Sequence, residues 1–383
     1  MNTADTLAGA TIPTLWLAAL VALAATAALV LLLLPLARHW GWLDQPDVRK
    51  THRQPTPLVG GVAVFVAFFA VAVGLTGSAA PLAPLLVASA IVLITGLVDD
   101  RRPLGAPVRF LAQGLACAVM VFWGGVLLTD FGQLFGPFTL GLGWLAVPIT
   151  VFAALGVINA FNMIDGLDGL SGSVFVIAAA AMAVLAAVAG RADTAALLTL
   201  MIGAVLGFLA LNLRLPWNRR ARTFLGDSGS VLLGFWLAWM FIDLGNGSRA
   251  GVERAFAPMT AVWLIGVPLL DTTRLMRNRW KAGRSAFEAD RHHLHHAFLA
   301  AGFTVGQAWW GIVGLSALFA AVGVGFELAG APDWVSFYTF IAAGLVYLRV
   351  MKRAWSRERF LGRAFRPDAL PDALREPRPD ASS

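Results

Sequence analysis

The sequence contains little charge and almost no cysteine. Only 13% of its 383 residues are Asp, Glu, Lys or Arg, and 58% are hydrophobic, whereas soluble domains carry about 25% charged residues. This composition excludes a water-soluble enzyme and a disordered chain. The single cysteine, Cys117, excludes an intrachain disulfide and therefore a disulfide-stapled secreted domain. Histidine is also scarce, but four of the six lie between positions 292 and 296, which is the first sign of a chemical site.

Long apolar runs fill most of the chain. A helix of about 20 apolar residues crosses the roughly 30 Å hydrocarbon core of a bilayer. We therefore predict an all-α, polytopic membrane protein with about eleven transmembrane helices. The segment 126–142, which is rich in Gly, Pro and Phe, is predicted to be an interfacial hairpin or loop. The predicted spans are 13–36, 58–78, 81–98, 106–125, 143–163, 169–190, 193–213, 224–245, 257–275, 305–327 and 333–350.

Lys and Arg concentrate in alternate connections between these spans. One side holds 26 of the 29 Lys and Arg residues, and the other holds only Arg191, Arg249 and Arg254. Because cytoplasmic loops are enriched in Lys and Arg, we predict a periplasmic N-terminus and a cytoplasmic C-terminus. The net charge of +7 then reflects orientation and attraction to anionic membrane lipids, so no nucleic-acid partner is expected. We expect one transmembrane domain over 1–350 and a basic cytoplasmic tail, disordered in part, over 351–383.

Acidic residues gather at predicted helix ends on the cytoplasmic side. Asp99 and Asp100 follow the third span, Asp165 and Asp168 follow the fifth, and Asp227 begins the eighth. Mg²⁺ prefers carboxylate oxygens and is usually held by one or two carboxylates plus substrate phosphates. Carboxylates gathered without a cation would repel one another. This pattern predicts a metal-dependent site for a phosphorylated substrate at the inner face.

Each acidic motif also has a structural explanation. The double Asp is commonly a solvated pair. The stretch "NAFNMIDGLDGL" (159–170) is typical of a helix end followed by a cap, although Asn159, Asn162 and Asp165 are spaced to share one helix face. The stretch "FLGDSGS" (224–230) fits a helix N-cap, yet its glycines also let backbone N–H groups approach an anion.

Two basic segments complete the set of candidate sites. A zinc site is the rival explanation for the histidine cluster, but adjacent histidines on a helix point in different directions and the region has no cysteine. Contacts to phosphate and sugar fit better, with a solvated basic loop as the alternative. The loop 44–61 could hold a diphosphate, or its charges could only set orientation. The basic residues of the loop 44–61 are Arg49, Lys50, His52 and Arg53. Those of the histidine region are Arg284, Arg291, His292, His293, His295 and His296.

Taken together, the motifs resemble a known family. "DQPDVRKTHRQPTPLVGG", "LVDDRRPL", "NAFNMIDGLDGL", "FLGDSGS" and "DRHHLHHAFLAAGFT" occur in the order and spacing of the polyprenyl-phosphate N-acetylhexosamine-1-phosphate transferases. The similarity runs from about residue 44 to 305. It is strongest to the bacterial undecaprenyl-phosphate GlcNAc-1-phosphate transferases (WecA-type). The arginines after the double Asp and Leu294 within the histidine cluster differ from the MraY-type branch.

The resemblance implies roles for individual residues. Asp227 would bind Mg²⁺, with Mn²⁺ as a substitute. Asp99 and Asp100 would orient or deprotonate the lipid phosphate or bind the metal. The catalytic and nucleotide centre would include Asp165 and Asp168. The implied substrate-binding residues are Lys50, His52, Asn159, Asn162, Arg291, His293, His295 and His296.

The implied reaction transfers GlcNAc-1-phosphate from UDP-GlcNAc to undecaprenyl phosphate, giving undecaprenyl-diphospho-GlcNAc and UMP. In the bacterial inner membrane this would be the first membrane step of O-antigen or a related polysaccharide. Two mechanisms stay open, direct attack and a covalent aspartyl-phosphate intermediate. Another UDP-N-acetylhexosamine or UDP-MurNAc-pentapeptide stays open as the donor substrate, and a homodimer stays open as the oligomeric state. A transporter is the competing class, but transporters place ionisable groups near the membrane midplane, and here only Asp271 comes near that position.

Overall fold

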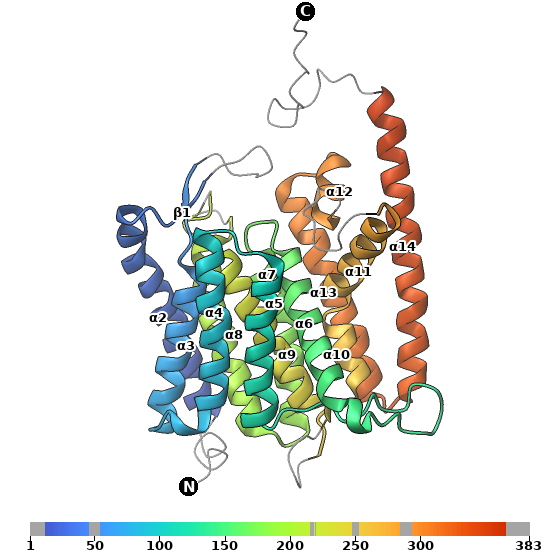
Figure 1. Ribbon diagram of the computed structural model, residues 1–383, viewed down its shortest axis with the longest axis horizontal. Coiled ribbons are helices and arrows are strands. Elements are labelled where there is room, and N and C mark those ends of the chain that lie inside the picture. Colours follow the sequence, from blue (N-terminus) through green and yellow to red (C-terminus); the bar gives the residue numbers. More distant parts are fainter. Residues whose placement is uncertain are drawn as a thin grey trace, which may run out of the picture.

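The computed structural model describes residues 12–45, 54–214, 218, 220–246, 253–283 and 293–364 (Figure 1). These residues form helices and one small sheet, in which β1 (Leu43–Asp44) pairs antiparallel with β2 (Thr56–Pro57). The all-α prediction is confirmed for this part of the chain. The helices are α2 (Ile12–His39), α3 (Gly60–Thr76), η1 (Ala80–Leu82), α4 (Ala83–Arg101), α5 (Ala106–Ala118), η2 (Val119–Trp123), η3 (Gly143–Leu145), α6 (Ala146–Ile164), α7 (Leu170–Val188), α8 (Ala192–Asn212), α9 (Gly226–Asn246), α10 (Pro258–Leu264), α11 (Gly266–Lys281), α12 (Leu294–Ala300), α13 (Val305–Leu328) and α14 (Asp333–Ala364).

Nine helical segments within the described residues are long and apolar enough to cross a membrane. The other two predicted spans take different forms. The span at 58–78 is α3, whose 17 residues lie at the short end of the range of about 17–25 that can cross a bilayer. The span at 257–275 is divided at Ile265 into α10 and α11. The protein is therefore a multi-pass membrane protein, and the count of eleven and the orientation stay predictions.

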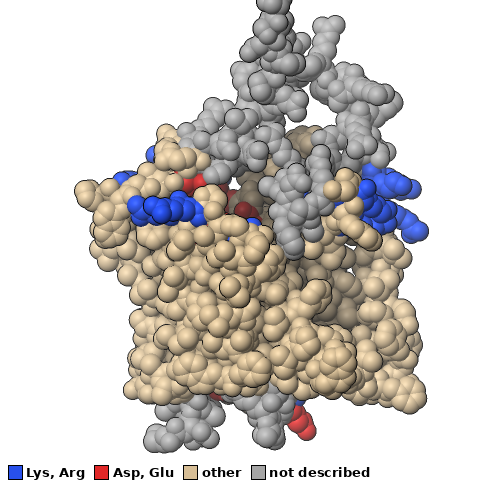
Figure 2. All heavy atoms as spheres, in the orientation of Figure 1, with Lys and Arg blue, Asp and Glu red and all other residues tan. Residues whose placement is uncertain are grey.

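The helices form a bundle whose ends differ in charge. In Figure 1 the chain enters α2 at the lower end, and α14 extends beyond the other helices at the upper end. Figure 2 shows Lys and Arg along the upper edge of the visible face, above a broad belt without charged side chains among the residues it colours. Asp and Glu atoms are visible in a hollow near that edge. On this face, Lys and Arg therefore gather at the upper end, where the hollow with the acidic atoms lies.

Helix α9 forms the centre of the bundle. It packs against α3, α4, α6 and α7, and its membrane-spanning window is buried along its whole length, as expected for a helix that is apolar on all sides. Trp236 is fully buried, with its ring centroid 4.7 Å from that of Phe68 and 6.3 Å from that of Phe175. The Trp236 indole N–H donates to the hydroxyl of Ser89 at 2.9 Å, which satisfies its polar atom.

Glycines let α9 approach its neighbours closely near the upper end. A Cβ at Gly61 of α3 would lie 2.6 Å from the Cα of Gly229, and a Cβ at Gly96 of α4 would collide with the backbone of Ser228. A side chain at either position would push the helices apart. Because of this approach, the last turn of α4 lies against the first turn of α9, and both turns carry aspartates.

The connections agree with the sequence in two places. The short connections after α3 and α7, which the predicted spans leave only a few residues long, contain Gly77 (φ +67°) and Gly190 (φ +75°), in the left-handed region that glycine favours. The loop 126–142 is confirmed as non-helical, with Asp130 and Gly141 in an isolated antiparallel bridge.

Candidate active site

The double aspartate has two different roles at the end of α4. Asp100 faces α9, where its Oδ1 accepts the backbone N–H of Asp227 at 2.7 Å and its Oδ2 accepts that of Ser228 at 3.2 Å. The anion that the N–H groups of the "FLGDSGS" turn meet is therefore the carboxylate of Asp100. This carboxylate satisfies N–H groups that lack partners within the helix and fixes α9 to α4.

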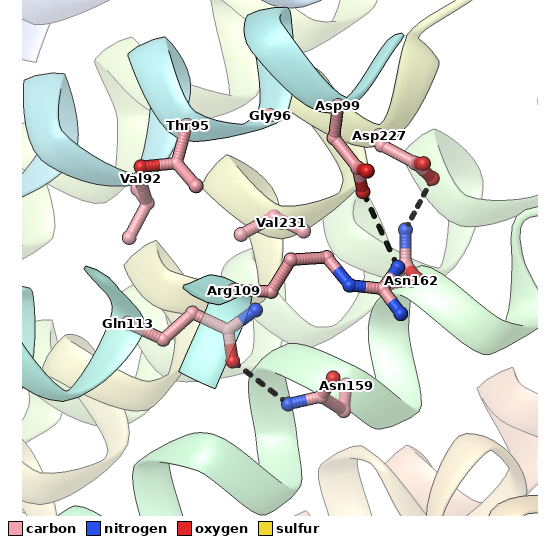
Figure 3. A pocket seen from close by; sticks show the side chains of 10 residues that line it. All are labelled: Val92, Thr95, Gly96, Asp99, Arg109, Gln113, Asn159, Asn162, Asp227 and Val231. Carbon is pink, nitrogen blue, oxygen red and sulfur yellow. Dashed lines mark hydrogen bonds and ion pairs between the residues drawn. The ribbon is translucent and has the colours of Figure 1, made fainter. Parts of the chain in front are cut away.

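Asp99 points into a hollow between α4, α5, α6 and α9. Its Oδ1 accepts the backbone N–H of Leu104 at 2.6 Å, and its Oδ2 forms an ion pair with Nη1 of Arg109 at 3.2 Å (Figure 3). Arg109 lies in the first turn of α5. The hollow holds about 350 Å³ of empty space, counting its opening to solvent. It is lined by Val92, Thr95, Gly96, Asp99, Arg109, Gln113, Asn159, Asn162, Asp227 and Val231.

Asp227 and the two asparagines face the same hollow from α9 and α6. The Asn162 amide donates to Asp227 Oδ1 at 2.8 Å and to the Ser230 hydroxyl at 2.9 Å. The Asn159 amide donates to Gln113 Oε1 on α5 at 2.9 Å (Figure 3). The structure thus brings together Asp99, Asn159, Asn162 and Asp227, which the sequence placed at three distant positions.

Asp165 and Asp168 do not line this hollow. Helix α6 ends at Ile164, so Asp165 is its C-cap residue and lies just beyond the helix on which the spacing placed it. Asp165 accepts the Ser171 hydroxyl at 2.7 Å, and burial, assisted by the charges of Asp227, Asp100 and Asp168, raises its pKa to about 7. Asp168 forms an ion pair with Nε of Arg214 at 2.6 Å. These two carboxylates stabilise the turn between α6 and α7.

The histidine cluster packs onto this turn. His293 precedes α12, and His295 and His296 lie in its first turn, with the rings of the latter two 4.2 Å apart between centroids. The His295 ring lies so close to Gly166 that a Cβ there would collide with it. His295 is buried, and this burial lowers its pKa to about 3, so the ring is neutral at pH 7.

Some predicted site residues lie outside the described residues. They are Lys50, His52 and Arg291, together with Arg49, Arg53, Arg284 and His292.

The hollow suits a hard divalent cation. Asp99 and Asp227 present carboxylates to one space, and Asn162 adds an amide. Among the described residues, no group of three or more His, Cys, Asp or Glu is arranged to hold a metal ion. Mg²⁺ needs fewer protein ligands than that, because it takes one or two carboxylates and completes its coordination with water and substrate phosphate.

Sequence reasoning missed two residues of the hollow. Arg109 was counted only as an orientation charge, and Gln113 received no role. Both lie on α5 at a spacing of four residues, which places them on one face of an otherwise apolar helix. Two polar residues at this spacing in a membrane helix are the signal that would have found them.

Comparison with known proteins identifies the family of this chain. Residues 82–245 match the profile of the family described as Glycosyl transferase family 4. The chain belongs to this family, and the family resemblance of its motifs is confirmed. It is a membrane transferase.

Several similar proteins carry the same name. Three of them are the "Undecaprenyl-phosphate alpha-N-acetylglucosaminyl 1-phosphate transferase" of Escherichia coli O157:H7, Yersinia pestis and Haemophilus influenzae. The E. coli protein is 36% identical over 332 residues, which cover 86% of this chain and 89% of that protein. The Yersinia protein is 37% identical (84% and 87% covered), and the Haemophilus protein is 34% identical (86% and 92% covered).

Proposed function

We propose that this protein transfers GlcNAc-1-phosphate from UDP-GlcNAc to undecaprenyl phosphate and releases UMP. The observation that carries the proposal is the meeting of Asp99, Arg109, Asn162 and Asp227, from four helices, in one hollow near the helix ends. A substrate in the bilayer and a substrate in water can both reach such a position. The names of the similar proteins support undecaprenyl phosphate as the acceptor and N-acetylglucosaminyl 1-phosphate as the transferred group. The site would face the cytoplasm in a bacterial inner membrane. The reaction would be the first membrane step of O-antigen or related polysaccharide synthesis.

The main obstacle to this reaction is the charge of its two substrates. Two unit charges 4 Å apart repel by about 4 kcal/mol at an effective dielectric of 20. Arg109 contributes one positive charge at the hollow. Asp99 and Asp227 would hold Mg²⁺, which, when bound, neutralises charge on the transferring phosphoryl group.

The protein's own residues would organise the transfer. Asn162 fixes the Asp227 carboxylate by donating to Oδ1 at 2.8 Å, and Asp100 holds the first turn of α9 in place. Arg109 uses one of its five N–H donors on Asp99, and its other donors are suited to phosphate oxygens. Asn159 and Gln113, joined at 2.9 Å, form the wall of the hollow on the α5–α6 side.

The attacking group needs no strong base. A phosphate monoester has a second pKa of about 6, so undecaprenyl phosphate is largely a dianion at pH 7. One of its oxygens attacks the phosphorus that is bonded to the sugar, and the bond from that phosphorus to UMP breaks. We favour this direct route because Asp99 and Asp227 both accept hydrogen bonds from neighbouring groups. His293, His295 and His296 would contact the sugar nucleotide.

The test is a substrate panel with purified protein. The protein would be incubated with Mg²⁺ and undecaprenyl phosphate and with UDP-GlcNAc, UDP-GalNAc or UDP-MurNAc-pentapeptide in turn, and UMP release and lipid product would be measured. We expect both products with UDP-GlcNAc. Turnover with only another UDP-sugar would replace the substrate assignment, and vesicle uptake without UMP release would favour a transporter.

A further inference from the structure

A buried cluster of polar groups lies beside the histidines and outside the hollow. It consists of Asp271, Arg274, His293, Leu294 and Tyr347, and we call it the Asp271 cluster. Asp271 Oδ1 accepts Nη2 of Arg274 at 2.7 Å and the hydroxyl of Tyr347 at 3.0 Å. Asp271 Oδ2 accepts the backbone N–H of Leu294 at 3.1 Å, and Nδ1 of His293 lies 3.5 Å from it. Asp271 is 4% exposed and Tyr347 is 8% exposed.

The cluster joins three segments that are far apart in the sequence. Asp271 and Arg274 belong to α11, Leu294 is the first residue of α12, and Tyr347 lies on α14. Tyr347 and Leu294 bind different oxygens of the same carboxylate. The carboxylate therefore connects the C-terminal helix to the helix that carries the histidines.

The histidines are held from two sides. On one side the first turn of α12 is bound to Asp271 through the Leu294 N–H. On the other side the His295 ring packs on Gly166, in the turn that follows α6. Loss of the bond to Asp271 would leave α12 held chiefly by packing, so its histidine rings would lose a defined position relative to that turn.

Charge neutralisation alone does not explain this arrangement. Arg274 lies one helical turn from Asp271 and already compensates its charge within α11. The additional bonds to Leu294 and Tyr347 come from other helices, and they use acceptor positions that a simple ion pair would not need. A buried carboxylate with several donors fixes the geometry of its neighbours.

We propose that Asp271 and Tyr347 are positioning residues that set the affinity for the sugar nucleotide by holding the histidine helix α12. The proposal rests on the proposed function, in which the histidines contact that substrate. It predicts a change in KM for UDP-GlcNAc, because weaker binding of both substrate and transition state raises KM and leaves kcat nearly constant. Under this proposal Tyr347, on α14, influences substrate binding although it does not contact the substrate.

The experiment compares variants of the purified full-length enzyme. Tyr347→Phe removes only the hydroxyl, and Tyr338→Phe is its control, because Tyr338 lies on the same helix and is 54% exposed. Asp271→Asn is compared with Asp243→Asn, because Asp243 is a buried carboxylate that binds Arg191 at 2.7 Å beside the α7–α8 connection, away from α12. His293→Ala reports on the histidines themselves. For each variant, kcat, KM for both substrates and thermal stability in detergent are measured.

The expected result is specific to one substrate. Tyr347→Phe raises KM for UDP-GlcNAc by roughly 3- to 10-fold, the effect of one lost hydrogen bond, and leaves KM for undecaprenyl phosphate unchanged. Asp271→Asn has a larger effect in the same direction if it folds, and Tyr338→Phe and Asp243→Asn keep the wild-type KM.

Three outcomes separate the inference from the function on which it rests. If His293→Ala raises KM for UDP-GlcNAc but Tyr347→Phe matches Tyr338→Phe, the positioning role is wrong and the role of the histidines stands. If His293→Ala has wild-type constants, the histidines do not contact UDP-GlcNAc, and the inference fails while the transferase function stands. If the wild-type enzyme releases no UMP from UDP-GlcNAc, the proposed function itself fails and the inference fails with it.

Discussion

Arg109 provides the sharpest test of the hollow as the active site, because its expected contribution to activity is larger than its contribution to stability. Its guanidinium lies 3.2 Å from Asp99, but its side chain is 37% exposed. An ion pair this exposed contributes at most about 1 kcal/mol to folding. A charge-assisted hydrogen bond from Arg109 to the transferring phosphoryl group, made in the transition state, is worth about 1.5–3 kcal/mol. Arg109→Met should therefore reduce kcat by roughly 10- to 150-fold with little loss of stability.

The assay follows UMP release at saturating UDP-GlcNAc and undecaprenyl phosphate, with thermal stability in detergent measured in parallel. Arg102→Met is the matched control, because Arg102 is exposed at the end of α4, near the same end of the bundle. Arg109→Lys should restore part of the activity, since lysine keeps the charge but lacks the planar set of donors. The reasoning is refuted if Arg109→Met retains wild-type kcat, or if Arg102→Met loses as much.

The remaining predictions concern other residues of the site. Asp227→Asn should abolish UMP release while the protein still folds, as should chelation of Mg²⁺ from the wild type; substantial activity in either case contradicts the metal assignment. Gly166→Ala should raise KM for UDP-GlcNAc because its Cβ displaces the His295 ring, whereas Gly156→Ala, with nothing within 4 Å, should not; equal effects would disprove this coupling. His295 has a pKa of about 3 in the folded protein and about 6.5 in the unfolded chain. As the pH drops below about 6.5, the unfolded chain takes up a proton that the folded protein does not, so the stability falls. His295 costs about 2 kcal/mol of stability at pH 5, so His295→Gln should show a smaller loss of Tm between pH 7 and pH 5 than the wild type, and an identical loss would contradict that pKa.

The membrane fold could be predicted from the sequence because its cause is local. Length and apolar content define most spans, and Gly77 and Gly190 mark the turns between close helices. The interruption at Ile265 was missed, although Gly266 and Pro268 lie within the next three residues, because a hydropathy window averages over such breaks. Burial of α9 could not be predicted, since composition does not show which apolar helix occupies the centre of a bundle.

The candidate site was predicted in part. Carboxylates at helix ends identified Asp99 and Asp227, and the helical spacing identified Asn159 and Asn162. The sequence could not show that Asp100 binds the first turn of α9, or that Asp168 pairs with Arg214, because these contacts span 127 and 46 residues. Arg109 was missed because a positive charge near a helix end serves orientation as readily as chemistry.

The central claim is that Asp99 and Asp227 hold one divalent cation against the phosphates of the sugar nucleotide. It is tested most directly by electron paramagnetic resonance of the purified protein with Mn²⁺ in place of Mg²⁺ and UDP-GlcNAc bound. We predict hyperfine coupling between Mn²⁺ and ³¹P in the wild type, and loss of this signal in the Asp99→Asn, Asp227→Asn double variant. An unchanged ³¹P coupling in that variant would contradict the account.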